Sequence, residues 1–133
     1  MARLHALAIV TPRPWSAAEI AALLAGPHVF AINETHGFLL GRAVAGEAEV
    51  LTLAVAPDAR RQGVGGRLLA GFVTEAVARG AHRAFLEVAA DNTAAIGLYR
   101  RAGFVTAGVR RRYYRSADGR AVDALVMDRP LFD

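Results

Sequence analysis

The sequence predicts an α/β domain in which short strands alternate with helices. Turn signals recur at intervals that suit short elements of both kinds, and no repeat, low-complexity tract or long polar linker separates them. The chain has 133 residues, of which 54% are hydrophobic, so it can bury one core without metal or disulfide cross-links. We therefore expect residues 1–133 to form a single domain.

The N-terminal part predicts one helix by its end signals. Ser16 and Glu19 form a capping box, and the helix that follows should end at Gly26 and Pro27. The stretch before it combines helical spacing with residues that favour extended structure, and we interpret residues 3–9 as a short helix.

Six further segments have the alternation, the β-branched residues and the flanking turn residues that predict strands. They are Val29 to Ile32, Gly37 to Ala45, Ala48 to Val55, His82 to Ala89, Phe104 to Tyr114 and Ala121 to Met127. Short turns join the first three, so we expect these to form an antiparallel meander. Residues 116–119 should form the hairpin turn between the last two.

Two more helices are expected between these strands. The first follows a glycine-rich loop and should end at Gly80, and the second should be capped by Asp91 or Asn92 and end at Gly103. The first helix has one apolar stripe, formed by Leu68, Leu69, Phe72, Val73, Ala76 and Val77. A helix with such a stripe is expected to pack on the sheet.

Composition and charge limit the classes of function. The net charge of +4 arises from sixteen basic residues, all arginine. Arginine favours bidentate contacts with phosphate or carboxylate, but a modest positive charge more often belongs to a solvated surface, and we prefer that interpretation. The absence of cysteine excludes disulfides, cysteine-ligated metal and a thiol nucleophile. Residues 1–10 are too short for a membrane span and lack a cleavage site, so we expect a soluble, cytoplasmic protein.

The strongest local motif is Arg60-Arg61-Gln62-Gly63-Val64-Gly65-Gly66, which lies between a strand closed by Pro57 and an amphipathic helix. Glycines let backbone N–H groups approach an anion closely, and a helix N-terminus favours negative charge, so the loop predicts a cradle for a phosphate ester. No Gly-Lys-Ser/Thr follows, and Leu68 replaces the third glycine of a dinucleotide fingerprint. The alternative is a glycine-rich turn with solvated arginines.

The loop resembles the signature of the GCN5-related N-acetyltransferase superfamily: arginine or glutamine, two residues, glycine, one residue, then glycine or alanine. From about residue 47 to 130 the chain also resembles bacterial ribosomal-protein alanine N-acetyltransferases. The matching segments are Leu53-Ala54-Val55, Leu86-Glu87-Val88, Asn92, Ala95-Ile96, Leu98-Tyr99, Gly103-Phe104, Tyr113-Tyr114 and Asp123-Ala124, with Pro14-Trp15-Ser16 as a further landmark. The resemblance implies a mixed, mostly antiparallel twisted sheet flanked by helices, with a splayed central strand pair.

In that fold, acetyl-CoA would lie between the strands at residues 51–55 and 82–89. Leu53, Ala54 and Val55 would then offer backbone groups to the pantetheine arm and the thioester. The loop from Arg60 to Gly66 would hold the pyrophosphate, and Asn92 would make a polar contact. Without the resemblance, the first three are core-strand residues and Asn92 is a helix cap.

Glu87 lies in an otherwise apolar strand, where a carboxylate faces either a solvated sheet face or a polar cleft. The resemblance favours the cleft and implies that Glu87 is a general base for the α-ammonium of the acceptor, whose reference pKa is about 7.7–8. It also implies that Tyr99, otherwise a packing residue, is the general acid for the CoA thiolate. Because no cysteine can carry an acyl group, we expect direct transfer.

Tyr113 and Tyr114 lie among Arg110, Arg111, Arg112 and Arg115. Such a grouping could bind nucleic acid, but strand alternation sends some of the arginines to solvent, and the resemblance implies that the two tyrosines contact the acceptor. The four histidines lack the spacing of metal ligands, so we expect no metal site.

Together these features predict an N-acetyltransferase that moves acetyl from acetyl-CoA to the N-terminal α-amine of a protein, such as a ribosomal protein that starts with alanine. The alternatives are acetylation of a small-molecule amine and a non-catalytic module that binds CoA or RNA. Only residues 1–13 precede the Pro14-Trp15-Ser16 landmark, fewer than the family has, so we expect the first strand to be absent. The missing strand could change which acceptor the protein takes, and it could favour a homodimer. Neither a membrane nor nucleic acid is an expected partner.

Overall fold

The computed structural model describes residues 17–59, 63–115 and 118–131. Its elements are α2 (Ala17–Ala25), β1 (Val29–Glu34), β2 (Gly37–Val44), β3 (Glu47–Val55), a 3-10 turn (Pro57–Ala59), α3 (Val64–Ala78), β4 (Arg83–Ala89), α4 (Thr93–Arg101), β5 (Val105–Arg115) and β6 (Ala121–Pro130). The helices and strands expected after residue 16 are confirmed, with small shifts at their ends. The expectations for residues 1–16, including the capping serine and the absent first strand, lie outside the described residues.

The strands of the described residues form one mixed sheet in the order β1-β2-β3-β4-β6-β5. The first three form the expected antiparallel meander, and β6 pairs antiparallel with both β4 and β5, whereas β3 and β4 are parallel. The last strand continues to Pro130 rather than ending at Met127, because residues 128–130 still pair with β4. Asp128 and Arg129 are polar and gave no strand signal. The predicted mixed, mostly antiparallel fold is confirmed.

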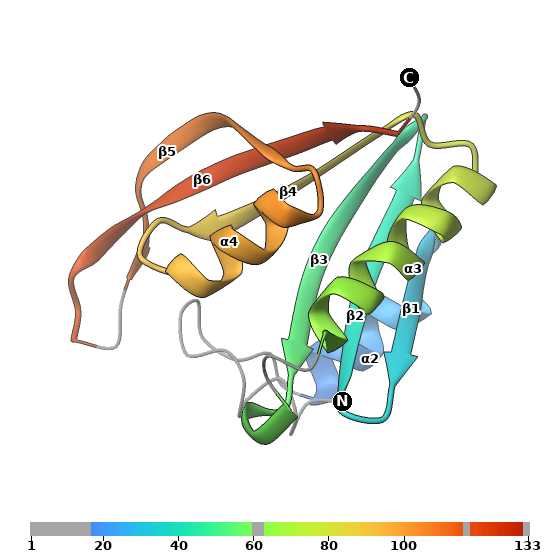
Figure 1. Cartoon of the computed structure of the whole chain (residues 1–133), viewed down its shortest axis with the longest axis horizontal. Coiled ribbons are helices and arrows are strands. Elements are labelled where there is room, and N and C mark those ends of the chain that lie inside the picture. Colours follow the sequence, from blue (N-terminus) through green and yellow to red (C-terminus); the bar gives the residue numbers. More distant parts are fainter. Residues whose placement is uncertain (1–16, 60–62, 116–117, 132–133) are drawn as a thin grey trace.

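Helices α3 and α4 cover one face of the sheet, and α2 lies behind the other (Figure 1). The predicted apolar stripe of α3 faces the sheet, except that Val77 is 36% exposed. Phe72 from this stripe is fully buried and stacks on Phe30 of β1, with ring centroids 5.9 Å apart. Across the described part of the chain, no helix has the length and apolar character that a membrane span needs.

A two-residue turn, Ala45-Gly46, joins β2 to β3. Both residues have positive φ, 54° and 82°, which is the combination of a type I′ hairpin turn. The Gly46 carbonyl accepts a hydrogen bond from the His82 N–H at 2.8 Å. A Cβ on Gly46 would lie 2.6 Å from Nε2 of His82, so glycine is needed for close approach as well as for φ. This contact fixes the hairpin to the start of β4.

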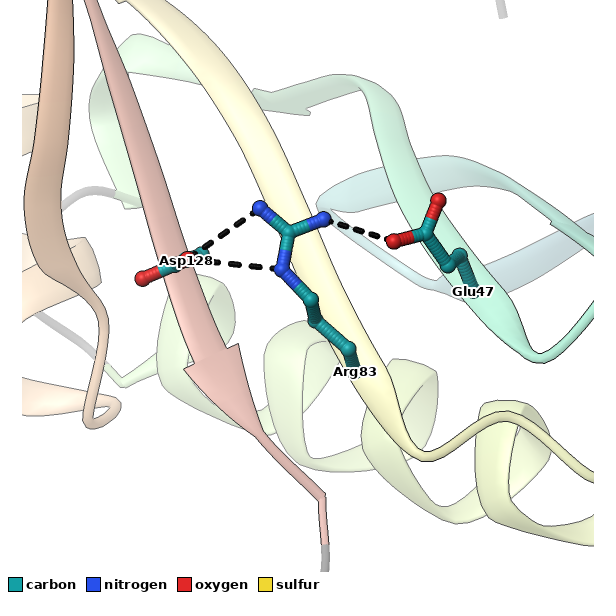
Figure 2. Close-up of polar contacts among 3 residues, drawn as sticks. All are labelled: Glu47, Arg83 and Asp128. Atoms are coloured by element: carbon teal, nitrogen blue, oxygen red, sulfur yellow. Dashed lines mark hydrogen bonds and ion pairs between the residues drawn. The ribbon is translucent and has the colours of Figure 1, made fainter.

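Arg83 links β3, β4 and β6 at the end where these three strands lie side by side. Its guanidinium contacts Glu47 Oε2 at 2.9 Å and Asp128 Oδ2 at 3.1 Å (Figure 2). Burial lowers the pKa of Arg83, but the hydrogen bonds with Asp128 and Glu47 together outweigh that effect and leave the pKa raised. Exposed ion pairs of this kind add little stability, so Arg83 supplements the backbone pairing that sets the register of the three strands.

Candidate active site

The central strands β3 and β4 pair only at their first residues. Their parallel register covers three residue pairs, from Glu47 with Arg83 to Glu49 with Phe85. Beyond these pairs β3 continues along β2, and β4 continues along β6. The two strands diverge like the arms of a V (Figure 1). The splayed strand pair implied by the resemblance is confirmed, and we call the region between the unpaired backbone edges of β3 and β4 the wedge.

The backbone of β3 directs hydrogen-bonding groups into this wedge. Bonded and non-bonded pairs alternate along an antiparallel ladder, and the Ala56 N–H donates to the His36 carbonyl at 2.8 Å. In the same register Ala54 is a bonded partner of β2, whereas Leu53 and Val55 point their N–H and C=O groups away from β2 and toward β4. Of the three residues expected to contact acetyl-CoA, Leu53 and Val55 therefore face the wedge, and Ala54 pairs with β2.

The described part of the glycine loop contains glycines with different physical roles. Gly63 caps the N-terminus of α3 and has a φ of 78°, a conformation that favours glycine. A Cβ on Gly65 would lie 2.8 Å from Cδ2 of Leu98, so this glycine allows α3 to pack against α4. Gly66 is exposed, and a Cβ there would meet nothing within 4 Å. The Val64 side chain is buried in the core, so only its backbone could contact a ligand.

The N-terminus of α3 can bind an anion through its backbone. No side chain in the described residues caps it, and the first N–H groups of a helix have no acceptor inside the helix. The Arg67 guanidinium lies beside the cap, because a Cβ on Gly63 would be 3.1 Å from its Nη1. Glu34 holds Arg67 with both carboxylate oxygens at 3.0–3.2 Å, and this hydrogen bonding raises the pKa of Arg67. Arg67 was not predicted from the sequence, and the predicted residues 60–62 lie outside the described residues.

Helix α4 holds Asn92 and Tyr99 on the face of the sheet that α3 also covers. Asn92 caps α4, with Oδ1 accepting a hydrogen bond from the Ala95 N–H at 3.2 Å. The capping interpretation is confirmed, and a contact with acetyl-CoA would use the amide nitrogen. Tyr99 is 8% exposed, and its ring meets Phe104 edge-on with centroids 6.2 Å apart. Tyr99 is therefore a packing residue in this structure, and its role as an acid stays a prediction.

Glu87 lies on the opposite face of β4 from the core. Its neighbours Leu86 and Val88 belong to the buried cluster that includes Tyr99, so strand alternation places Glu87 and Tyr99 on opposite faces. The Glu87 side chain is 22% exposed, and its Oε1 lies 3.2 Å from Nη2 of Arg110 on β5. At this position β4 has no strand partner on its β3 side, so the backbone edge of β4 is open toward the wedge.

A bulge kinks β5 beside this carboxylate. The register with β6 shifts between Arg110 and Tyr114, and Arg112 within the bulge has a φ of 53°, which is uncommon for a residue other than glycine. The Asp123 carboxylate accepts a hydrogen bond from the Arg112 N–H at 2.9 Å and so holds the kink. The Tyr113 ring lies under the Arg110 guanidinium, 5.2 Å from it. The side chain of Tyr114 lies outside the described residues.

Glu87, Arg110 and Tyr113 thus form a chain of contacts across β4, β6 and β5, which we call the Glu87 cluster. The first and third of these residues were predicted as site residues, whereas Arg110 was predicted only as one of several arginines of which some face solvent. A recess of about 380 Å³ lies where β4 ends and β6 begins, lined by Ala90, Asp91 and residues 120–123. Within the described residues no group of acidic residues and histidines could hold a metal ion.

Residues 10–104 match the acetyltransferase (GNAT) family. The chain belongs to this family. The GNAT chain is 44% identical over 94 residues to ribosomal protein bS18-alanine N-acetyltransferase of Escherichia coli strain K12; the match covers 71% of this chain and spans 63% of the relative's length. It is 38% identical over 137 residues to the N-alpha-acetyltransferase RimI of Mycobacterium tuberculosis, covering 96% of this chain and 83% of that one.

Two solved structures of acetyltransferases resemble this GNAT fold. The crystal structure of the ribosomal-protein-S18-alanine N-acetyltransferase from Escherichia coli matches with a TM-score of 0.86 at 34% identity, covering 99% of this chain and 86% of that one. A phosphinothricin acetyltransferase from Sinorhizobium meliloti, crystallised in complex with AcCoA, matches with a TM-score of 0.74 at 24% identity, covering 93% and 74%. The second match concerns the fold alone.

Proposed function

We propose that this GNAT protein transfers an acetyl group from acetyl-CoA to the N-terminal α-amine of a protein. The observation that carries the proposal is the splayed pair of β3 and β4, which leaves the backbone of Leu53 and Val55 directed into a wedge beside the N-terminus of α3. The acceptor class follows from the names of the relatives with 44% and 38% identity. A ribosomal protein that begins with alanine is the acceptor to test first.

The residues around the wedge fit the parts of acetyl-CoA. A pantetheine arm carries amide groups that need N–H and C=O partners, and Leu53 and Val55 present such groups along one edge of β3. A pyrophosphate needs N–H donors and positive charge, which the start of α3 and Arg67 offer. When bound, acetyl-CoA supplies an activated thioester. Any contact from Arg60, Arg61 and Gln62 would add to this set.

Two side chains would move protons during the reaction. Glu87, on one face of β4, accepts a proton from the α-ammonium of the acceptor and so frees the amine to attack. Tyr99, on the other face, supplies its hydroxyl proton to the departing CoA thiolate. The wedge lies between the two faces, so the base and the acid act on opposite sides of the reacting group. No residue of this chain is needed as an acyl carrier.

CoA release from acetyl-CoA with two peptides tests the acceptor class. One peptide begins with a free alanine and lacks lysine, and its twin has a blocked N-terminus and carries one lysine. We expect release with the free peptide only. Release with neither peptide, at concentrations where acetyl-CoA binding is confirmed, would discard protein N-termini as acceptors. Polyamines and free amino acids, assayed in parallel, then decide whether the acceptor is a small amine.

Glu87→Gln tests the base. We expect turnover to fall about a hundredfold, while the dissociation constant of acetyl-CoA is unchanged, because the amide keeps the shape of the side chain but cannot accept the proton. Glu49→Gln is the matched control: Glu49 is also a partly exposed strand carboxylate paired with an arginine, Arg42 at 2.8 Å, but it lies where β3 and β4 still pair. Unchanged turnover in Glu87→Gln would remove Glu87 from the mechanism.

A further inference from the structure

Arg110 holds Glu87 by a weak ion pair. A single atom pair, Nη2 to Oε1, lies 3.2 Å apart, whereas charge-assisted hydrogen bonds are typically about 2.7–2.9 Å. The other ion pairs of the described residues are 2.8–3.1 Å long. The Arg110 side chain is 55% exposed, so water competes for its guanidinium. An exposed pair of this kind contributes little free energy, so a competing cation can replace it.

The sheet is built so that Arg110 can reach Glu87 from two strands away. On β6, the residue opposite Arg110 is Ala124, which also lies opposite Ala89 of β4. A methyl group at this crossing leaves room for the arginine side chain to pass over β6. On the far side, the Tyr113 ring lies 5.2 Å from the guanidinium and gives it a second contact that does not depend on Glu87.

The position of Tyr113 depends on the kink in β5. In a regular strand, side chains three residues apart point to opposite faces, so Arg110 and Tyr113 would not meet. The bulge removes this restriction, and the hydrogen bond from the Arg112 N–H to Asp123 holds Arg112 in its left-handed conformation. A strained residue fixed by a dedicated carboxylate, next to a proposed base, is typical of a functional arrangement.

We propose that Arg110 is the resident counterion of Glu87, which the α-ammonium of the acceptor displaces. This inference rests on the proposed role of Glu87. A base must come within hydrogen-bonding distance of the proton that it accepts, and in the free protein Arg110 contacts one of the two oxygens of that carboxylate and compensates its charge. The two cations compete for Glu87, so the acceptor binds more weakly than it would to an open carboxylate. After displacement, Arg110 stays on the Tyr113 ring, ready to return when the neutral product leaves.

The size of the effect follows from the weakness of the pair. An exposed ion pair strengthens an interaction by about fivefold at most. Replacing Arg110 by glutamine should therefore tighten acceptor binding about two- to fivefold. An acceptor whose N-terminus is acetylated carries no ammonium and does not compete for Glu87. Arg110 should therefore weaken the binding of cationic acceptors and leave the binding of uncharged acceptors unchanged.

The test is calorimetric binding of a free alanine-initiated hexapeptide, and of its N-acetylated twin, to the protein saturated with CoA. Arg110→Gln should bind the free peptide two- to fivefold more tightly and the twin as wild type does. Arg110→Lys keeps the charge and should restore wild-type affinity. Arg111→Gln is the control for net charge, because Arg111 is an exposed arginine next in the same strand and should leave the affinity unchanged. In a Glu87→Gln background, Arg110→Gln should have no effect.

Unchanged or weaker binding of the free peptide to Arg110→Gln would overturn the proposal, as would equal tightening in Arg111→Gln. These results leave the acceptor class and the base intact, since turnover of Glu87→Gln is measured separately. Normal turnover in Glu87→Gln would instead remove the proposed base. No binding of the free peptide to the wild-type protein would remove the acceptor class, and the role of Arg110 with it.

Discussion

Gly65 should be required for the packing of α4 against α3, and its exchange for alanine measures this requirement. A Cβ at Gly65 would lie 2.8 Å from Cδ2 of Leu98, whereas ordinary contact begins at 3.4 Å, so the two groups must separate by about 0.6 Å. Overpacking of this kind costs about 1–3 kcal/mol. Leu98 is only partly buried and can yield, so we expect about 1–2 kcal/mol.

Gly66→Ala is the matched control, because the same substitution occurs one residue later in the same helix, where a Cβ meets nothing within 4 Å. Both variants gain the helix propensity of alanine over glycine, about 0.5–1 kcal/mol. The free energy of unfolding should therefore rise by about 0.5–1 kcal/mol in Gly66→Ala. In Gly65→Ala it should fall by about 0.5–1 kcal/mol, since the crowding outweighs the gain.

Urea denaturation with linear extrapolation gives these free energies. Leu98→Ala removes the crowded atoms, so in that background Gly65→Ala should stabilise the protein as Gly66→Ala does. The coupling between Gly65 and Leu98 should then be about 1–2 kcal/mol. Equal effects of the two glycine substitutions in the wild-type background would refute the packing argument and leave ligand binding as the reason for Gly65.

Three further variants test single features of the site and the fold. Ala45→Asn should raise the free energy of unfolding by about 0.5–1 kcal/mol in urea titrations, because Asn-Gly suits the type I′ turn that Ala45 enters at a φ of 54°. Asn92→Ala should lower it by about 1 kcal/mol through loss of the cap, whereas Asn92→Ser keeps a capping oxygen and should keep stability; weaker acetyl-CoA binding by Asn92→Ser in calorimetry would support a contact from the amide nitrogen. Tyr99→Phe keeps the ring against Phe104, so far-UV circular dichroism should be unchanged, while turnover should fall about tenfold or more; full turnover would exclude Tyr99 as the acid.

Most elements of the fold could be predicted because their signals are local. The stripe from Leu68 to Val77 and the stop at Gly80 predict α3 from its own residues, and the structure has α3 end two residues before that glycine. The end of β6 could not be predicted in the same way. Asp128 has no apolar signal, and it belongs to the strand because it pairs opposite Phe85 and contacts Arg83, 45 residues earlier in the chain.

The candidate site was predicted less completely, for a related reason. Glu87 was named, but its face depends on which strands flank β4, and the sequence alone left that open. Its partner Arg110 lies on β5, and β6 separates β5 from β4 in the sheet. The contact therefore depends on a strand order that the sequence did not reveal. The glycine loop was assigned to phosphate binding as a unit, yet the packing of Gly65 against Leu98 depends on tertiary contacts that a loop motif does not contain.

The short pairing between β3 and β4 makes this boundary the weakest part of the sheet. At the β3–β4 boundary, three residue pairs and the guanidinium of Arg83 join two three-stranded parts of the sheet, β1-β2-β3 and β4-β6-β5, and the packing of Gly65 in α3 against Leu98 in α4 joins the helices that cover them. Beyond these pairs, the backbone of β3 makes no hydrogen bonds to β4, and a ligand with amide groups could make hydrogen bonds to that backbone instead. Such a ligand would act as an additional strand. Its binding would therefore determine whether the two parts of the sheet unfold as one cooperative unit or separately. Substrate binding would then also stabilise the sheet against unfolding.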